Sequence, residues 1–136
     1  MSSHAAGCPF CDSAALEVLD REGGCFALAG IDGPVGSVML LPFAHRVAPW
    51  DLTEEEWRDT RLLLARQQRR IEAEHHPDGW NVGWNVRPVG GQTVPHAHLH
   101  LLPRYADEPY AGRGLRWWFK HRDNARPGER ERGGST

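Results

Sequence analysis

The first forty residues alternate apolar runs with glycine-containing turns, as in a sheet of short strands. Residues 16–20 and 25–29 are expected to pair as a hairpin across the turn at Glu22-Gly23-Gly24. Residues 37–41 are a continuous apolar run that ends at Pro42, which is typical of a strand buried on both faces. This part of the chain therefore predicts three strands.

One long helix is predicted in the middle of the chain. It begins at Thr53, because Thr53 and Glu56 form a capping box in which each side chain accepts a hydrogen bond from the other residue's backbone N–H. It stops before Pro77. Three apolar positions, seven residues apart, are expected on its buried face: Trp57, Leu64 and Ile71.

Two further strands are predicted after the helix, separated by a glycine-rich loop at residues 90–93. Trp80, Val82, Trp84 and Val86 alternate with polar residues, so one face of the first strand is apolar. From His96 a second alternating strand continues to residue 102. It is expected to place His96, His98 and His100 together on one face, with Ala97, Leu99 and Leu101 on the other.

Composition limits the class of protein. The 136 residues suit one domain, with 40% hydrophobic and 25% charged residues and a formal net charge of -2. This charge favours neither nucleic acid nor an anionic membrane as a partner, and no apolar run is long enough to cross a membrane. The beginning of the chain lacks the pattern of a secretion signal, so we expect a cytoplasmic protein. Lys120 is the only lysine, against fifteen arginines.

The two ends of the chain differ from its centre. Residues 1–7 are expected to be flexible, and residues 123–136 have almost nothing to bury and are expected to be disordered. Between the last strand and that tail, residues 115–119 form an apolar cluster that suits a second, shorter helix. The expected domain is therefore 1–122, with an α+β fold: an antiparallel sheet of about five strands, one long helix and one short helix.

The three alternating histidines have three interpretations. They could be a surface stripe without function, or a cluster of metal ligands. Alternatively, one imidazole could be a nucleophile that the others orient, because a neutral imidazole is abundant at pH 7 and is a good leaving group once protonated.

Residues 91–105, Gly-Gln-Thr-Val-Pro-His-Ala-His-Leu-His-Leu-Leu-Pro-Arg-Tyr, resemble the signature of the histidine triad (HIT) superfamily. The resemblance extends to Gly36-Ser-Val-Met-Leu-Leu-Pro-Phe-Ala-His45 with the Leu52-Thr-Glu-Glu-Glu that follows it, and to Trp80-Asn-Val-Gly-Trp-Asn85. It covers about residues 8–120. It implies a HIT-like fold, a homodimer and an enzyme that acts at the α-phosphate of a nucleotide.

The resemblance also assigns roles. His98 matches the middle histidine of the triad and would be the nucleophile that forms a nucleotidyl-histidine intermediate, and His100 would bind the phosphate. Substrate-binding positions carried over in the same way are Asn85, Gly91 and Thr93, with Gln92 among them. A glycine-rich loop that presents backbone N–H groups to anionic oxygens independently favours a phosphate at this place.

A zinc site is predicted at Cys8, Cys11, His45 and His96. A Cys-x-x-Cys pair can present two thiolates to Zn²⁺, and two histidines can complete a tetrahedral site. The pair could also be redox-active or structurally idle, but many HIT proteins resemble this sequence in carrying zinc on these four positions. Four protein ligands would make the metal structural, with His96 on the zinc and His98 free for chemistry.

The sequence departs from the commoner pattern at two points. Ser37 stands where many members have a histidine after the glycine, and Ala29 stands where many have an aspartate that contacts the ribose. Asp32 is close enough to replace that aspartate, although acidic residues in such turns are often only turn formers. Trp117 and Trp118 are candidates for a contact with the leaving group or with a partner subunit.

The expected function is hydrolysis of a dinucleoside polyphosphate or an adenosine phosphoramidate at the α-phosphate. The sequence does not distinguish between these two leaving groups. Two alternatives remain: a nucleotidyl transferase or phosphorylase of the same superfamily, and a non-catalytic module that binds nucleotide and zinc.

Overall fold

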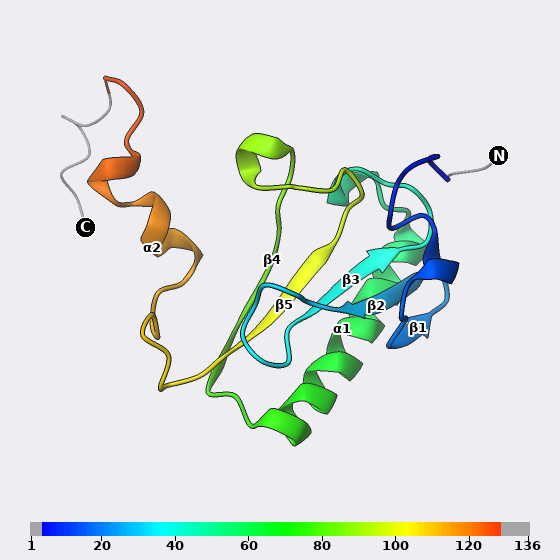
Figure 1. Cartoon of the computed structure of the whole chain (residues 1–136), viewed down its shortest axis with the longest axis horizontal. Coiled ribbons are helices and arrows are strands. Elements are labelled where there is room, and N and C mark those ends of the chain that lie inside the picture. Colours follow the sequence, from blue (N-terminus) through cyan, green and yellow to red (C-terminus); the bar gives the residue numbers. More distant parts are fainter. Residues whose placement is uncertain (1–3, 129–136) are drawn as a thin grey trace.

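The computed structural model describes residues 4–128. Five antiparallel strands form one open sheet in the spatial order β1-β2-β3-β5-β4 (Figure 1). Their bounds are β1 Asp20–Glu22, β2 Cys25–Ala29, β3 Val38–Pro42, β4 Gly79–Trp84 and β5 Leu99–Arg104. The two α-helices are α1, Glu54–His75, and α2, Leu115–Phe119, and short 3-10 helices lie at Ser13–Ala15, Pro49–Asp51, Pro88–Gly90 and Arg122–Asn124. The expected α+β fold is confirmed. None of the described helices has the length and apolar character needed to cross a membrane.

Helix α1 begins as the sequence predicts. The Thr53 hydroxyl accepts a hydrogen bond from the Glu56 N–H at 3.1 Å, and the Glu56 carboxylate accepts one from the Thr53 N–H at 2.8 Å. The helix ends at His75, and the next residue, His76, has a left-handed φ of 50° and is followed by Pro77. Helix α1 lies along one face of the sheet (Figure 1).

The buried face of α1 differs from the prediction. Ile71 is fully buried, but Trp57 is 42% exposed and Leu64 is only partly buried, whereas Leu63 is in the core. Four polar side chains share the buried face: Glu56, Asp59, Thr60 and Gln67. These side chains are hydrogen-bonded to the backbone and to the hairpin; for example, the Asp59 carboxylate accepts a hydrogen bond from the Gly24 N–H. Because these residues are polar, the apolar periodicity of the sequence does not identify them as buried.

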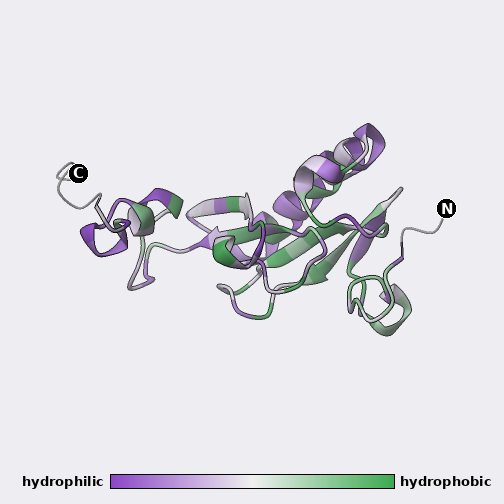
Figure 2. Ribbon diagram, turned by 90° about the horizontal axis from the view of Figure 1, so that it is seen from above, coloured by the Kyte–Doolittle hydropathy of each residue, from purple (hydrophilic) through white to green (hydrophobic). Residues whose placement is uncertain are grey.

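The sheet separates two apolar clusters. On the α1 side, β2, β3 and β5 contribute residues such as Ala27, Leu40 and Leu101. On the other side, Phe26, Leu28 and Leu41 are covered by the N-terminal segment, including Phe10. Figure 2 shows α1 and the N-terminal segment on opposite sides of the sheet, with the hydrophobic colour concentrated in the strands.

Two predicted strands begin three or more residues later than expected. The first begins at Asp20, not at residue 16, because Leu16 and Val18 pack against the second cluster without joining the strand ladder. The last begins at Leu99, three residues after His96. The segment before it leaves the sheet: the Ala97 N–H donates to the Arg46 carbonyl instead of to a strand.

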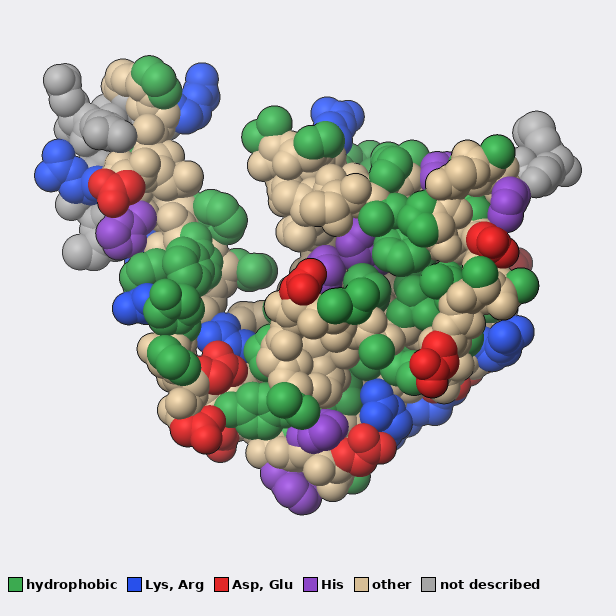
Figure 3. Space-filling model, viewed as in Figure 1, with side chains coloured by type: hydrophobic (Ala, Val, Ile, Leu, Met, Phe, Trp, Pro, Cys, Tyr) green, Lys and Arg blue, Asp and Glu red, His purple; other side chains and the backbone are tan. Residues whose placement is uncertain are grey.

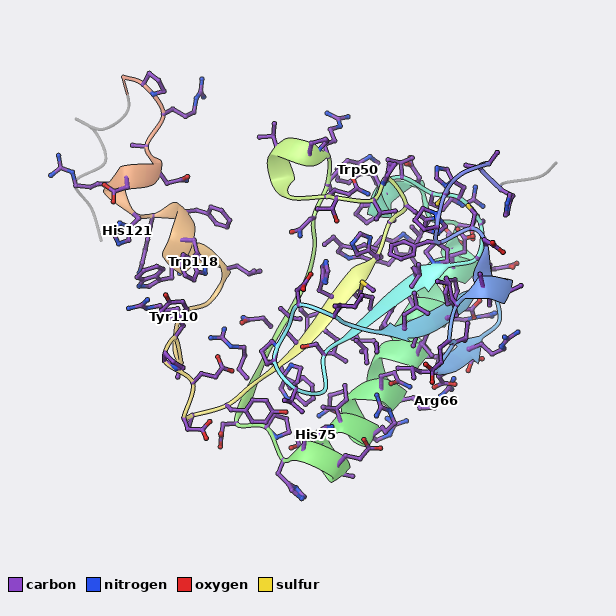
Figure 4. All side chains as sticks on the ribbon, in the orientation of Figure 1. Trp50, Arg66, His75, Tyr110, Trp118 and His121 are labelled. Atoms are coloured by element: carbon purple, nitrogen blue, oxygen red, sulfur yellow. The ribbon has the colours of Figure 1, made fainter. Side chains whose placement is uncertain are left out.

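The chain after β5 forms an arm, residues 106–128, that stands away from the sheet (Figures 1 and 3). Arg104 fixes its base, donating hydrogen bonds to the backbone carbonyls of Tyr110 and Arg113. Tyr110 and Trp118 point toward each other on the arm (Figure 4), with ring centroids 5.6 Å apart. Lys120 follows α2 and is exposed. Of the segment expected to be disordered, residues 123 and 124 lie in a 3-10 helix, and 129–136 lie outside the described residues.

Candidate functional site

A cleft of about 670 Å³ lies on the sheet face opposite α1. Its floor comes from alternate positions of neighbouring strands, since His100 pairs with Met39 on one side and with Gly83 on the other. The loop at residues 30–34 forms one wall, and Leu115 of α2 contributes from the arm. In Figure 3 the surface is hollowed between the arm and the body, and histidine side chains reach the edge of this hollow.

His98 and His100 are the histidines that line the cleft. Their ring centroids are 4.9 Å apart, in an edge-to-face arrangement. The Nδ1–H of His98 donates to the His96 carbonyl at 2.8 Å, so a neutral His98 ring carries its lone pair on Nε2. Burial, and then the nearby His98, lower the pKa of His100 below its ordinary value, which favours neutral His100 near pH 7.

His96 has the opposite tautomer and another environment. Its Nε2–H donates to the Pro42 carbonyl at 2.8 Å, which leaves the lone pair on Nδ1. It is fully buried and does not line the cleft, so the predicted face of three histidines holds only for His98 and His100. The physical reason is that the Ala97 N–H donates to the Arg46 carbonyl outside the strand ladder, and the His96 ring is held by the Pro42 carbonyl beside the Cys8 and Cys11 sulfurs.

The other predicted substrate residues fall into two groups. Asn85, Thr93 and Asp32 line the cleft together with the two histidines. Gly91 and Gln92 do not line it. The Gln92 side chain is buried and hydrogen-bonded at both ends of its amide: the NH2 group donates to the Val47 carbonyl, and the oxygen accepts from the Arg87 N–H. Gly91 lies next to the Asn85 side chain and has a left-handed conformation, with a φ of 96°.

Cys8, Cys11, His45 and His96 form a second cluster, with all four potential ligand atoms within 4.8 Å of one another. The Cys8 sulfur lies 3.4 Å from His96 Nδ1, and the Cys11 sulfur lies 3.6 Å from the same nitrogen and 3.3 Å from His45 Nδ1. A tetrahedral zinc ion with bonds of about 2.3 Å to sulfur and 2.0–2.1 Å to nitrogen separates such ligands by roughly 3.5 Å. The cluster therefore has the dimensions of a four-ligand zinc site.

The protonation chemistry of the cluster also suits a metal ion. Burial lowers the pKa of His96, so the imidazole is neutral and its Nδ1 lone pair is available. Burial raises the pKa of the Cys11 thiol, and a cation among these atoms would reverse that effect by favouring the thiolate. The predicted ligands can thus hold a metal ion together.

Comparison with known proteins identifies the family. The family model described as "HIT domain" matches residues 17–107 of this chain. The chain belongs to the HIT family.

The HIT relatives include named enzymes. A bis(5'-adenosyl)-triphosphatase of *Saccharomyces cerevisiae* is 37% identical over 71 residues, 52% of this chain and 34% of the relative. A bifunctional bis(5'-adenosyl)-triphosphatase/adenylylsulfatase of *Arabidopsis thaliana* is 37% identical over 73 residues, 52% of this chain and 41% of the relative. The chain thus spans less than half the length of these curated relatives.

Solved HIT structures share the fold. A HIT family protein from *Bacillus anthracis* superposes with a TM-score of 0.70 at 29% identity, covering 76% of this chain and 77% of that one. A HIT family member from *Bacillus subtilis* covers 93% of this chain and 91% of that one with a TM-score of 0.72, at 24% identity. The sheet, the two helices and their order are therefore those of the HIT fold.

The residues that line the cleft without having been anticipated from the sequence include Phe10, Met39 and Leu115. Phe10 and Leu115 come from segments far from the triad in sequence, and only the tertiary fold brings them to it. The position of Phe10 could have been predicted from the sequence. Phe10 lies between Cys8 and Cys11, and the expected metal site joins these two cysteines to His96 of the triad.

Proposed function

We propose that this HIT protein hydrolyses nucleotides at the α-phosphate, with His98 as the nucleophile. The observation that carries the proposal is the tautomer of His98: its Nδ1–H is committed to a backbone carbonyl, which leaves the Nε2 lone pair in a side chain that lines the cleft. The named activities of the yeast and plant relatives support the same class of reaction.

The reaction proceeds in two displacements. His98 Nε2 forms a bond to the α-phosphorus, and the bond from that phosphorus to its bridging oxygen or nitrogen breaks, so the leaving group departs with the electron pair. A phosphate leaving group can depart as an anion, whereas an amine takes up a proton from water as the P–N bond breaks. Water then attacks the phosphorus, loses a proton and releases His98 and a nucleoside monophosphate.

The remaining cleft residues act on the substrate without forming covalent bonds. We place neutral His100 against a phosphate oxygen, where its N–H can donate, with Asn85 and Thr93 as further donors. Asp32 lies at the cleft and its carboxylate can accept hydrogen bonds from ribose hydroxyls in place of the aspartate absent at Ala29. Gly91 and Gln92 act indirectly: Gly91 gives Asn85 room, and Gln92 fixes the loop.

We propose Zn²⁺ as the ion of the Cys8, Cys11, His45 and His96 cluster. Mixed thiolate and imidazole ligands suit zinc, and four protein ligands leave no position for substrate. Bound there, the metal would supply structural stability and no Lewis-acid chemistry. A zinc content near one per chain that disappears in Cys11→Ser would support this role.

We also propose a homodimer, formed through the outer edge of β4. Within residues 4–128 this edge has no partner strand, and Val82 on it is 42% exposed. Trp57, also 42% exposed, contacts Trp84 beside the same edge. An open strand edge beside exposed apolar groups can be covered by the same edge of a second copy. Light scattering should find a dimer for the wild type and a monomer for Val82→Arg.

A cytoplasmic location is proposed from the cysteines. Cys8, Cys11 and Cys25 form no disulfide, which suits a reducing compartment.

The decisive experiment measures release of nucleoside monophosphate from a diadenosine polyphosphate, an adenosine phosphoramidate and a nucleotide sugar. Wild type should turn over at least one of them, and His98→Asn should lose turnover while still binding the monophosphate. His76→Asn is the matched control, because His76 is exposed and occupies a left-handed position that asparagine tolerates well. Turnover that survives in His98→Asn would refute the nucleophile.

The same panel separates the alternatives. Binding of monophosphate by wild type without turnover of any substrate would favour the non-catalytic module. Formation of a nucleoside diphosphate when inorganic phosphate is supplied would favour the phosphorylase, in which phosphate replaces water in the second displacement.

A further inference from the structure

Phe10 occupies a position between the metal cluster and the cleft. It lies between Cys8 and Cys11 in sequence, so the two sulfur ligands fix the backbone on both sides of it. Its ring makes edge-to-face contacts with His96, at 5.9 Å between centroids, and with His98, at 5.3 Å. The same ring lines the cleft. One side chain therefore touches a metal ligand, the nucleophile and the space for the nucleotide.

A second connection runs through the backbone of His96. The imidazole of His96 faces the cysteine sulfurs, while its carbonyl accepts the Nδ1–H of His98. A displacement of His96 would thus move the acceptor that selects the His98 tautomer. Phe10 and the His96 carbonyl restrain the His98 ring from two different directions.

Residues 5–11 make few other polar contacts with the rest of the described chain. The hydrogen bonds among residues 5–11 are local, such as the Cys8 N–H to the Ala5 carbonyl. Between these residues and the rest of the described chain, the polar contacts run through the sulfurs of Cys8 and Cys11. Apolar packing of Phe10 against the second cluster is the other attachment. The position of Phe10 therefore depends strongly on whether the four ligands are held together.

We propose that Phe10 is a positioning residue that couples the metal cluster to the nucleotide cleft, so that zinc and a nucleoside monophosphate each strengthen the binding of the other. The proposal rests on the function proposed above. With zinc bound, Phe10 packs against the His98 ring and forms part of the cleft wall. Without zinc, residues 5–11 lose their polar attachment to the body, and Phe10 is held less firmly against His98 and the cleft. Such coupling is necessarily reciprocal, because the two orders of binding lead to the same final complex.

The test measures both halves of this cycle on the whole chain. One measurement is the Kd of adenosine monophosphate for zinc-loaded and zinc-depleted protein. The other is the affinity for zinc, by competition with a chromogenic chelator, with and without saturating monophosphate. Wild type should show the same ratio in both, about fivefold or more. In Phe10→Leu, which keeps an apolar side chain, both ratios should fall toward one while stoichiometric zinc is retained.

Phe43→Leu is the matched control. Phe43 is also partly buried against the second cluster, stacked on Phe26 at 4.5 Å, but it does not line the cleft. It should keep the coupling of the wild type. Equal coupling in Phe10→Leu and wild type, absence of coupling in wild type, or absence of zinc binding would each overturn the proposal.

A further measurement needs no metal-free protein. In zinc-loaded Phe10→Leu, the ¹⁵N chemical shifts of the His98 ring should move relative to wild type, because the ring loses one of its two restraints. If zinc removal unfolds the chain, unchanged His98 shifts in this variant decide against the proposal. Wild type that binds no monophosphate would instead refute the proposed function, so the two failures are distinguishable.

Discussion

Gly91 offers the sharpest test of how the glycine-rich loop supports the cleft. Its φ is 96°, and a Cβ at this position would lie 3.4 Å from the Asn85 amide nitrogen. A Gly91→Ala change thus carries a backbone penalty of about 1–2 kcal/mol for the left-handed conformation. The new methyl group would be in van der Waals contact with Asn85, which lines the cleft, so a shift of the backbone that relieves the left-handed conformation would also displace this side chain.

The expected loss of function follows from the contact that Asn85 would give up. A hydrogen bond to a charged group contributes about 1.5–3 kcal/mol, which corresponds to roughly 10- to 150-fold in binding or rate. Gly91→Ala should therefore lower the free energy of unfolding by about 1–2 kcal/mol and weaken monophosphate binding by about tenfold or more. Urea unfolding measures the first effect and calorimetric titration the second.

The adjacent glycine provides the control. Gly90 has no positive φ, and a Cβ there would meet nothing within 4 Å. Gly90→Ala should leave binding unchanged and stability equal or slightly higher, since alanine restricts the unfolded chain. If Gly90→Ala and Gly91→Ala behave alike, the proposed support of Asn85 is wrong.

Three further outcomes are expected. Gly23→Ala should destabilise the hairpin by about 2–4 kcal/mol, because the left-handed φ at this position is unfavourable for alanine and the new Cβ would displace the Asp59 carboxylate from the Gly24 N–H. Gly24→Ala is the control: a Cβ there makes only ordinary contacts, so urea unfolding should find it nearly neutral. The Arg66 side chain, on α1 facing β1 (Figure 4), lowers the pKa of Asp20 through a hydrogen bond of 2.8 Å. The pair stabilises the fold at pH values above the unfolded-state pKa of Asp20, about 4, and this stabilisation is lost as the pH falls through the lower pKa of the folded state. Arg66→Met should therefore be less stable than wild type at pH 7. Thermal unfolding near pH 2–3 should show a smaller difference between the two proteins. Incubation with a strong chelator should lower the Tm of wild type and leave the Tm of Cys11→Ser unchanged.

The features that the sequence predicted correctly depend mostly on local chemistry. The capping box at Thr53 needs only two residues three apart in sequence, and the hairpin turn needs only its two glycines. The metal cluster joins Cys11 to His45 and His96 across the fold, and it was anticipated from the resemblance to HIT proteins that carry zinc at these positions, not from local chemistry.

The features that were wrong or missed depend on tertiary structure. The strand at His96 was expected from alternation alone, but the Ala97 N–H donates to the Arg46 carbonyl, and alternation carries no information about that acceptor. The buried face of α1 includes Gln67, which is polar but hydrogen-bonded to Asp20. Leu115 reaches the cleft only because Arg104 fixes the base of the arm.

The single lysine gives the arm a practical use. Lys120 follows α2, whose first residue, Leu115, lines the cleft, and it is exposed. An amine-reactive fluorophore would therefore label one side chain, close to the tryptophan pair at 117 and 118, and could report ligand entry by quenching. A lysine-specific protease would cut the chain once, after Lys120, and remove residues 121–136 in one step. Truncation and labelling of the arm thus need no mutagenesis.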